Sequence, residues 1–452
     1  MFQYAAKTKL ILLLSLVYLL SACKKGHIAK SSDKKLLTFV FKAADNPNAL
    51  LTDVTATIDG DTIRVSLDQG TDLNLIPALT FTGKSISPDN GVSQNFANPI
   101  NYTITAEDGS TKSYPIKLTL LAANSKIYTG SDDGNLYCLK GSTGTLLWKY
   151  ATGAAIQTTP AILNNVIYAG CSDGNLYAID ATTGTLKWKY NAGVPILDPV
   201  VANGLVFIAG NNQYTIKIIA LDATTGNFKW NQQYSVVYTA AYNPTVSGDK
   251  LVICLGLGTN VYDQATGTLI WGSGASGITV MNPAVANGKV YTGGESGLYC
   301  FDLYTGALIW TTHIGPLRNA PTIYNGVVYV GVTNLLYAVD ANSGNVLWKS
   351  SYQSYYRSPC VMNGSIYDNL LAVAGYGNGA LTWSKNAVGA APVTAANAVL
   401  FAGGSDKYLY AFNALDGSTK WKFLTNGAIN GGACIVDTEG NAYYPSSGGN
   451  KN

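Results

Sequence analysis

The chain has 452 residues, which leaves room for two or three domains. Charged residues make up only 12% of it and the formal net charge is +3, so the sequence lacks the basic character that is typical of nucleic-acid-binding proteins. The 30 tyrosines and 48 glycines favour many short strands joined by tight turns.

The N-terminus has the features of a bacterial lipoprotein signal. Lys7 and Lys9 precede an apolar run over 10–20, which is too short to span a membrane but suits the core of a signal peptide. The run ends in Leu-Ser-Ala-Cys, which resembles the lipobox of bacterial lipoproteins. The resemblance implies that residues 1–22 are removed and that Cys23 carries the lipid anchor, with palmitate. The alternative is an ordinary signal peptide with an incidental cysteine.

A short polar segment follows the cysteine. Residues 23–35 are lysine-rich and aperiodic, so we expect a flexible tether between the lipid and the first domain. A lipid anchor makes a transmembrane helix unnecessary. In lipoproteins of this kind, a lysine directly after the cysteine (here Lys24) does not favour retention in the inner membrane. We therefore expect the outer membrane, facing either the periplasm or the cell surface.

Residues 36–121 show short alternating strands without a helical period. Asp59-Gly60 and Asp108-Gly109 each stand between two such strands, which is a strong hairpin signal. We predict an immunoglobulin-like β-sandwich. The run 102–118 also resembles the Ig-like modules found near the lipid anchor of Gram-negative surface lipoproteins, which implies a spacer between membrane and next domain.

All eight tryptophans of the chain recur at a spacing of about forty residues, and a glycine stands four residues before each. The tryptophans are Trp148, Trp188, Trp230, Trp271, Trp310, Trp348, Trp383 and Trp421. A fixed motif at this period is the mark of a repeat architecture.

The second repeat shows the expected strands most clearly. Two strands flank the turn at Asp173-Gly174, a third follows the turn at Thr183-Gly184, and a fourth opens at Pro199. Seven of the eight repeats have a proline at this last position, and the eighth has Ala433. Four antiparallel strands in each of eight units predict an eight-bladed β-propeller over 122–452.

The ends of the repeat array are out of step with the blades. The array begins inside a blade at Lys126 and ends with residues 432–436, which we expect to supply the missing inner strand of the first blade. Residues 441–446 resemble a surplus copy of a repeat strand, for which the sequence gives no place.

The segment 178–188 resembles the tryptophan-docking motif of the PQQ-type propellers. An aspartate stands eight residues before the tryptophan in five repeats, at Asp180, Asp222, Asp263, Asp302 and Asp340. Lys140, Gly375 and Asn413 replace it in the first, seventh and eighth repeats. The resemblance implies that each tryptophan packs on the next blade and that each aspartate ties its own turn.

Two branches of this superfamily differ in chemistry. Quinoprotein dehydrogenases bind PQQ and calcium on the axis, commonly with a vicinal disulfide and a catalytic aspartate. This chain has no adjacent cysteines. The other branch, the BamB-like outer-membrane lipoproteins, is a scaffold without a cofactor. The lipobox and the eight repeats resemble that branch, so we expect neither PQQ nor calcium. BamB itself lacks an Ig-like domain.

Histidine, cysteine and aspartate offer little evidence of a catalytic or metal site. The two histidines are His27 in the tether and His313 after a repeat tryptophan, which excludes a histidine-rich metal site in the propeller. The turns at Asp133-Gly134 and Asp173-Gly174 lack the further oxygen ligands of a calcium loop. Six cysteines follow Cys23, and those that share a repeat position lie in non-neighbouring repeats, so we expect no disulfide framework.

The most informative candidates for binding lie just before the inner strands. In a propeller these loops converge at one end of the axis, where polar side chains can surround the channel mouth. The candidates are Thr159, Asp198, Asn243, Asn282 and Ser358, with Arg318, Arg357, Tyr352, Tyr355 and Tyr356 close by in sequence. The arginines suit a carboxylate or backbone carbonyl, and the tyrosines suit a peptide or a sugar. Solvated loop residues without a binding role are the alternative.

These observations favour a non-enzymatic outer-membrane lipoprotein whose propeller binds another envelope protein as a scaffold. A glycan-binding surface lipoprotein is the first alternative, and a quinoprotein-like oxidoreductase is the second. We expect partners at the membrane, through the lipid anchor, and among envelope proteins or glycans, but not among nucleic acids.

Overall fold

The computed structural model describes residues 30–445 with internal gaps. The gaps are 47–48, 51–52, 69–70, 122–124, 213, 236–240, 257, 275–280, 318, 333–334, 351–357, 363–364, 369–370, 374–380, 385–390, 397–398, 415 and 438–440. The chain divides into two compact units, Met1–Leu121 and Ala122–Asn452. Among the described residues no helix is found that is long and apolar enough to cross a membrane.

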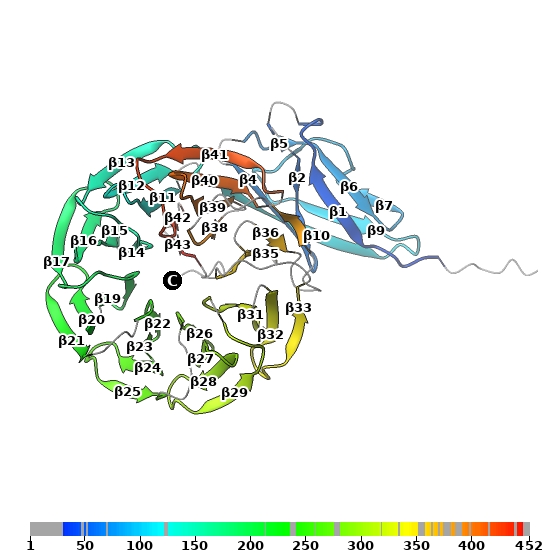
Figure 1. Ribbon diagram of the computed structural model, residues 1–452. Coiled ribbons are helices and arrows are strands. Elements are labelled where there is room, and N and C mark those ends of the chain that lie inside the picture. The colour runs from blue at the N-terminus through cyan, green and yellow to red at the C-terminus, as the bar shows by residue number, and fades with distance from the viewer. Residues whose placement is uncertain are drawn as a thin grey trace, which may run out of the picture. The chain divides into compact units, whose positions relative to one another are not determined.

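The described residues of the N-terminal unit form strands joined by turns and loops (Figure 1). They are β1 (Leu36–Phe41), β2 (Val54–Thr55), β3 (Thr57–Asp59), β4 (Thr62–Asp68), β5 (Asn74–Leu75), β6 (Pro77–Phe81), β7 (Ser85–Ser87), β8 (Gln94–Asn95), β9 (Asn101–Thr105) and β10 (Thr111–Leu121). They form a three-stranded sheet in the order β2-β1-β6, a five-stranded sheet in the order β3-β4-β10-β9-β7, and the pair β5-β8.

An aromatic cluster forms the core between the two larger sheets. Phe39 and Phe41 come from β1, and Tyr102 and Tyr114 come from β9 and β10. The Phe39 ring meets those of Phe41 and Tyr102 edge to face, at centroid distances of 5.2 and 5.6 Å. Such edge-to-face pairs add to the free energy gained from burying the rings. The unit is therefore a β-sandwich, as predicted.

Both predicted hairpins of this unit are confirmed. Asp59 pairs with Thr62 around the first turn, and Thr105 pairs with Thr111 around the second. One pairing could not be read from the alternation of apolar residues, because the second half of β10 runs parallel to β4. Alternation predicts which face a side chain occupies, but not the direction of the neighbouring strand.

The second unit consists of eight blades arranged around a centre (Figure 1). Blade 1 contains β11 (Lys126–Gly130), β12 (Asn135–Lys140), β13 (Leu146–Ala151), β42 (Cys434–Val436) and β43 (Ala442–Tyr443). Blade 2 contains β14 (Ala161–Leu163), β15 (Val166–Gly170), β16 (Asn175–Asp180) and β17 (Leu186–Asn191). Blade 3 contains β18 (Val200–Ala202), β19 (Leu205–Asn211), β20 (Thr215–Asp222) and β21 (Phe228–Ser235). Blade 4 contains β22 (Thr245–Ser247), β23 (Lys250–Leu255), β24 (Gly258–Asp263) and β25 (Leu269–Gly272).

The other four blades repeat this arrangement of four antiparallel strands. Blade 5 contains β26 (Ala284–Ala286), β27 (Lys289–Gly293), β28 (Leu298–Asp302) and β29 (Leu308–Thr312). Blade 6 contains β30 (Thr322–Tyr324), β31 (Val327–Val332), β32 (Leu335–Asp340) and β33 (Val346–Lys349). Blade 7 contains β34 (Cys360–Met362), β35 (Ser365–Asp368), β36 (Leu371–Val373) and β37 (Leu381–Ser384). Blade 8 contains β38 (Thr394–Ala396), β39 (Val399–Gly403), β40 (Tyr408–Asn413) and β41 (Thr419–Leu424).

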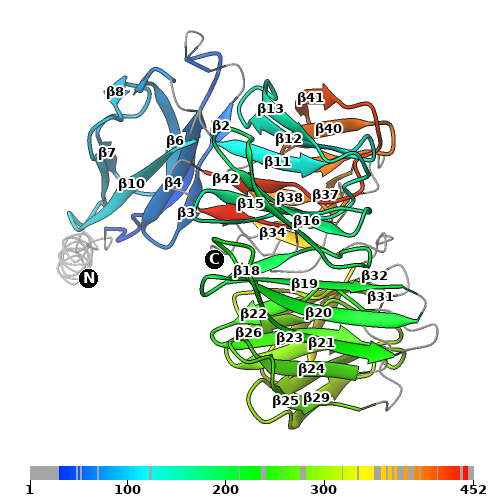
Figure 2. The same cartoon turned by 90° about the vertical axis from the view of Figure 1, so that its left-hand side faces the viewer.

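Neighbouring blades bury their faces against one another. One core cluster joins Tyr168 and Ala178 of blade 2 to Val206 and Leu221 of blade 3. Other clusters join later pairs of blades in the same way. Figure 2 shows blades 3 and 4 stacked face to face. The all-β fold with a propeller of four-stranded blades is therefore confirmed.

The ring closes in blade 1. The strand β42 pairs with β11, with Tyr128 opposite Cys434, and so supplies the inner strand expected from residues 432–436. The surplus segment has a place too, because β43 pairs with β42 and makes blade 1 five-stranded. The hydroxyl of Tyr444, just after β43, accepts a hydrogen bond from the Ile162 backbone N–H at 3.0 Å and thereby contacts blade 2.

Candidate functional site

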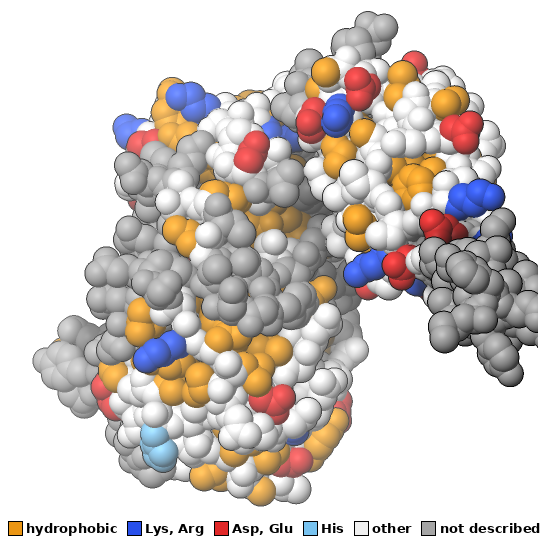
Figure 3. Space-filling model, turned by 90° about the vertical axis from the view of Figure 1, so that its right-hand side faces the viewer, with side chains coloured by type: hydrophobic (Ala, Val, Ile, Leu, Met, Phe, Trp, Pro, Cys, Tyr) orange, Lys and Arg blue, Asp and Glu red, His pale blue; other side chains and the backbone are white. Residues whose placement is uncertain are grey.

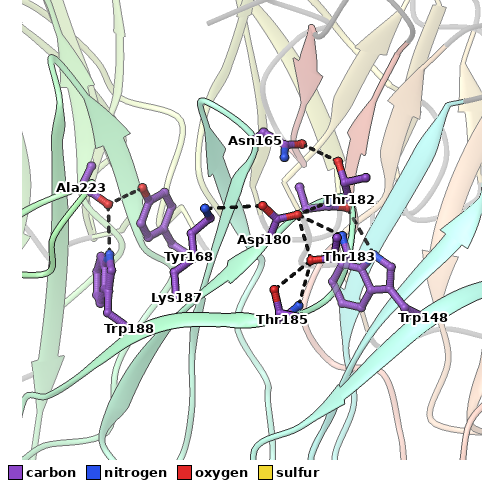
Figure 4. Close-up of polar contacts among 11 residues, drawn as sticks. Trp148, Asn165, Tyr168, Asp180, Thr182, Thr183, Thr185, Lys187, Trp188 and Ala223 are labelled. Atoms are coloured by element: carbon purple, nitrogen blue, oxygen red, sulfur yellow. Dashed lines mark hydrogen bonds and ion pairs between the residues drawn. The ribbon is translucent and has the colours of Figure 1, made fainter.

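In blades 2 to 6 the turn between the two outer strands is held by an aspartate. In blade 2 the Oδ1 atom of Asp180 accepts hydrogen bonds from the backbone N–H groups of Thr182 and Thr183, both at 2.9 Å (Figure 4). Lys187 on β17 places its Nζ atom 3.5 Å from the other carboxylate oxygen. The hydrogen bond from the Thr183 backbone is the main reason that the pKa of Asp180 lies below its usual value. The carboxylate is thus ionised and serves the turn.

Each tryptophan whose neighbour is described packs on the turn of the next blade. The indole Nε1 of Trp148 donates to the carbonyl oxygen of Ala181 at 3.2 Å, and that of Trp188 donates to Ala223 at 3.3 Å (Figure 4). A Cβ atom at Gly184 would lie 2.7 Å from the Trp148 ring, so only glycine leaves room for the indole. The repeat tryptophans therefore hold blade to blade.

The same contact closes the ring, and it varies at one position. Trp421 of blade 8 donates to the carbonyl oxygen of Gly141 in blade 1 at 3.0 Å. Trp310 packs against Gly344 of blade 6, but its buried Nε1 atom has no hydrogen-bond partner among the described residues. Blade 5 therefore docks on blade 6 through ring packing without the usual hydrogen bond.

Polar side chains before the inner strands link the blades through hydrogen bonds. The backbone N–H of Thr159 donates to Asp198 Oδ1 at 2.9 Å, and that of Asp198 donates to Asn243 Oδ1 at 3.1 Å. The backbone N–H of Asn243 then donates to Asn282 Oδ1 at 2.8 Å. Gly432 N–H donates to Thr159 Oγ1 at 3.0 Å and extends the series back to blade 1. The structure thus links four of the predicted candidates in one series of hydrogen bonds. We call these four residues the inner belt (Thr159, Asp198, Asn243, Asn282).

These contacts supply acceptors for backbone N–H groups that have no partner within their own blade. A residue before a proline at the start of a strand has a backbone N–H without a ladder partner, and the belt side chains accept from it. Ser358 does the same for Ala320, with an Oγ distance of 3.0 Å. The sequence predicted binding or simple solvation for these residues and not this structural use. The recurring small polar residue before the proline was the available signal.

Asp198 is the one titratable member of the inner belt. Its second carboxylate oxygen accepts a hydrogen bond from Asn243 Nδ2 at 2.9 Å. The residue keeps some accessible surface, but the inner strands desolvate its carboxyl group and raise its pKa to about 6. The carboxyl group therefore changes charge in a range where ordinary aspartates are fully ionised.

Several predicted candidates lie outside the described residues. These are Cys23, His27, Arg318, Tyr352, Tyr355, Tyr356 and Arg357. The lipidation site and the arginine–tyrosine group accordingly remain predictions.

The cysteines behave as buried apolar residues. Cys138, Cys171, Cys254, Cys300, Cys360 and Cys434 are all buried and free. The expectation that they form no disulfide framework is confirmed. Burial raises the pKa of the Cys434 thiol to about 12, so it is protonated at neutral pH.

The Asp-Gly turns serve local structure. Asp133 accepts a hydrogen bond from the hydroxyl of Tyr137 at 2.6 Å, and Asp173 accepts one from Tyr177 at 2.7 Å. Within the described part of the chain no group of three or more His, Cys, Asp or Glu side chains is arranged to hold a metal ion. The expectation that the chain binds neither PQQ nor calcium stays a prediction.

A cleft of about 610 Å³ lies in the N-terminal unit. Lys34, Lys112 and Tyr114 line it. The Nζ atom of Lys34 donates to Ser110 Oγ at 2.7 Å, and that of Lys112 lies 2.6 Å from Asp61. Both lysines are thus engaged within the unit.

The sequence matches two protein families. The family described as outer membrane protein assembly factor BamB matches residues 117–254 and 258–365, which is more than half of the chain. The family described as SGBP, N-terminal, matches residues 47–118. No curated protein matches the sequence.

Solved structures with a similar fold include BamB and several dehydrogenases. BamB from Moraxella catarrhalis is 19% identical, with a TM-score of 0.45, and the alignment covers 71% of this chain and 91% of that one. A europium-containing methanol dehydrogenase is 13% identical, with a TM-score of 0.43 and coverage of 71% and 80%. The dihydro-heme d1 dehydrogenase NirN is 12% identical, with a TM-score of 0.55 and coverage of 68% and 74%.

At these identities the structural likenesses concern the fold alone. The family match rests on sequence and covers six blades, with their repeated turns and tryptophans. The chain belongs to the BamB-type family of PQQ-like propellers.

Proposed function

We propose that the protein is a lipid-anchored outer-membrane lipoprotein without enzymatic activity, and that its propeller is a scaffold for another envelope protein. Membership of the BamB-type family is the observation that carries this proposal. The use of the repeat aspartates and tryptophans in self-packing supports it, because these side chains are then not available for chemistry.

Cross-linking in native outer membranes tests the proposal. A protein partner should be recovered with the wild type, and purified protein supplied with PQQ and Ca²⁺ should not reduce dyes with alcohols or sugars. Quinone absorbance together with such activity would favour the oxidoreductase and contradict the scaffold.

The anchor has its own test. The variant Cys23→Ala should leave the membrane fraction, because the lipid is the expected means of attachment. Membrane association of the variant after a high-salt wash would show that the lipobox assignment is wrong.

The predicted arginine–tyrosine group can be tested for partner binding. Arg318→Ala combined with Arg357→Ala should weaken binding of the cross-linked partner and leave the Tm unchanged, since guanidinium groups suit carboxylates and carbonyls on a partner. A fall in Tm would assign the arginines to the fold instead.

Glycan binding is the second candidate, and the match of residues 47–118 to the SGBP N-terminal family favours it. Affinity electrophoresis of the full mature chain against a panel of polysaccharides would detect it. Retardation that is lost in Tyr355→Ala with Tyr356→Ala, without a protein partner in cross-linking, would establish the glycan reading in place of the scaffold.

A further inference from the structure

The outermost strand of each blade is an edge strand with a β-bulge one residue before the tryptophan. In blades 2 and 3 the bulge residue is a lysine, Lys187 or Lys229. Their Nζ atoms lie 3.5 and 3.3 Å from Asp180 and Asp222 of the same blade. Lysine on an edge strand hinders pairing with another chain, and here it also neutralises the turn carboxylate.

Blades 4, 5 and 6 have an aliphatic residue at the same bulge. Ile270, Ile309 and Leu347 are 39%, 44% and 52% exposed. An exposed aliphatic residue precedes each of them, at Leu269, Leu308 and Val346. Three consecutive blades thus expose two apolar side chains each where blades 2 and 3 have one, followed by a lysine.

The three aliphatic pairs lie on the outermost strands of consecutive blades, and each of the first two blades docks on the next. Trp271, directly after Ile270, packs on the turn of blade 5 at Gly306, and this turn leads into β29. Trp310, directly after Ile309, packs in the same way on the turn of blade 6 at Gly344. Figure 3 looks onto the side of the molecule where β33 lies in Figure 1 and shows hydrophobic side chains there, whereas β25 lies away from this side. Apolar side chains that stay exposed on consecutive blades are typical of interaction sites.

The turns next to these aliphatic residues carry negative charge. Asp263, Asp302 and Asp340 each use Oδ1 to accept from the turn residue three positions later, as in blade 2. Among the described residues none of the three has a lysine or arginine within ion-pairing distance. Hydrogen bonds within the turn hold the pKa of Asp302 and of Asp340 below the usual value, so both are ionised at neutral pH.

The nearby cations have other partners. Lys250, which lies opposite Asp263 in the ladder, places its Nζ atom 2.6 Å from Asp249. Lys289 donates from Nζ to Asn342 Oδ1 at 2.9 Å. Lys289 also lies opposite Asp302 in the ladder, and Lys250 and Lys289 help to lower the pKa of Asp263 and of Asp340. With Asp249 included, four carboxylates face these two lysines, so the turns of blades 4 to 6 carry a net negative charge.

Blade 1 separates the two properties. It exposes Leu146 and Leu147 at the same positions, but Lys140 stands where the turns of blades 2 to 6 have aspartate. Apolar exposure together with an acidic turn therefore distinguishes blades 4 to 6 from blade 1 as well as from blades 2 and 3.

We propose that β25, β29 and β33, with the turns at Asp263, Asp302 and Asp340, form a docking surface for an extended protein segment that carries alternating aliphatic and Lys or Arg side chains. The aliphatic side chains of the segment cover the pairs in blades 4 to 6, and its cations meet the three carboxylates. The segment crosses the three outermost strands from blade to blade, and its side chains make the contacts. The inference rests on the proposed scaffold function and assigns it a surface and a class of partner.

A defined peptide tests this surface. The probe is a fluorescently labelled, disulfide-closed β-hairpin whose exposed strand alternates valine and lysine, and the measurement is fluorescence anisotropy with the full mature chain. The wild type should bind the hairpin, and binding should weaken as salt rises. The variant Ile270→Lys with Ile309→Lys and Leu347→Lys should bind at least tenfold more weakly.

Two controls separate this surface from general stickiness. Leu147→Lys in blade 1 makes the same change beside Lys140, and it should leave the Kd unchanged. A hairpin with glutamate in place of lysine should not bind the wild type. Thermal unfolding checks the fold of the triple variant, which copies the lysines of blades 2 and 3.

The inference is overturned if the wild type does not bind the lysine hairpin, if the triple variant binds it equally well, or if Leu147→Lys weakens it to the same degree. Cross-linking of the triple variant in outer membranes shows whether the docking surface alone is wrong or the proposed scaffold function is wrong as well. A partner recovered undiminished would retain the scaffold but place its binding site elsewhere, whereas a wild type with no protein partner would contradict the scaffold itself.

Discussion

Blades 2 and 3 and blades 4 to 6 are alike where they pack on each other and differ where they meet solvent. Both groups have the acidic turn with its glycine, and the tryptophans of blades 2 to 5 dock on the turn of the next blade. They differ at the bulge, which is Lys187 or Lys229 in one group and an aliphatic residue in the other. The contrast shows that the repeat preserves the contacts between blades. The exposed residues of the outermost strands, which we call the rim, are free to vary.

The largest expected effect tests the shared interior. Trp188→Ala in blade 2 and Trp271→Ala in blade 4 should each lower the free energy of unfolding by about 3–5 kcal/mol, because a large buried contact and a hydrogen bond are lost. Chemical denaturation measures this. A clearly smaller loss in blade 4 would show that the two groups of blades differ inside as well as at the rim.

A smaller loss is expected at the turn glycine. Gly184 has a φ of +73°, and a Cβ there would also meet the Trp148 ring. Gly204 has a φ of +76° with nothing within 4 Å, which makes it a matched control. Gly204→Ala should show only the backbone strain of about 1–2 kcal/mol, and Gly184→Ala should lose more. Equal losses would mean that the indole moves aside without energetic consequence.

The inner belt adds a dependence on pH. The pKa of Asp198 is about 6 in the folded protein, and its ordinary value of 3.8 applies to the unfolded chain. Between these pH values the folded state therefore binds more protons than the unfolded state. This group therefore favours folding at low pH, and its contribution is lost as the pH rises from 4 to 6. Aspartates with lowered pKa, such as Asp180, act in the opposite sense.

Asp198→Asn isolates this contribution. The stability of the wild type relative to the variant should fall as the pH is raised from about 4 to 6 and then level off. Denaturation curves at several pH values measure it. A constant difference across this range would show that the carboxyl group does not titrate there.

The smallest effects concern the rim. Lys187→Ile removes an exposed ion pair and Ile309→Lys removes an exposed methyl-rich side chain, so each should change the stability by less than about 0.5 kcal/mol. Thermal unfolding would detect anything larger. A large effect of either change would mean that the rim contributes to the fold and is not free to vary.

The repeat made the fold predictable from the sequence, because tryptophan and glycine spacing define the blade and a ring of such blades must close. The repeat array begins inside a blade, so the sequence also predicted that residues 432–436 complete the first blade. The place of the surplus segment did not, because pairing of β43 with β42 depends on an edge that forms only after closure.

The candidate sites were less predictable for a physical reason. The polar residue before each proline was visible, but its acceptor role depends on a backbone N–H of another blade, as between Thr159 and Asp198. The rim pattern was also visible, one residue before the tryptophan. Its meaning required the exposure of Ile309 and the lysine–aspartate distances in blades 2 and 3.

The completion of blade 1 by β42 has a consequence for biosynthesis. The strand β11 ends at Gly130, and its partner β42 begins at Cys434. Nearly the whole propeller must therefore be synthesised before the ring can close. A loop of about 300 residues carries a closure entropy of about 5 kcal/mol, which earlier folding of the intervening blades reduces. Until β42 has been synthesised, the inner edge of β11 has no partner from its own propeller and is open to pairing with other chains.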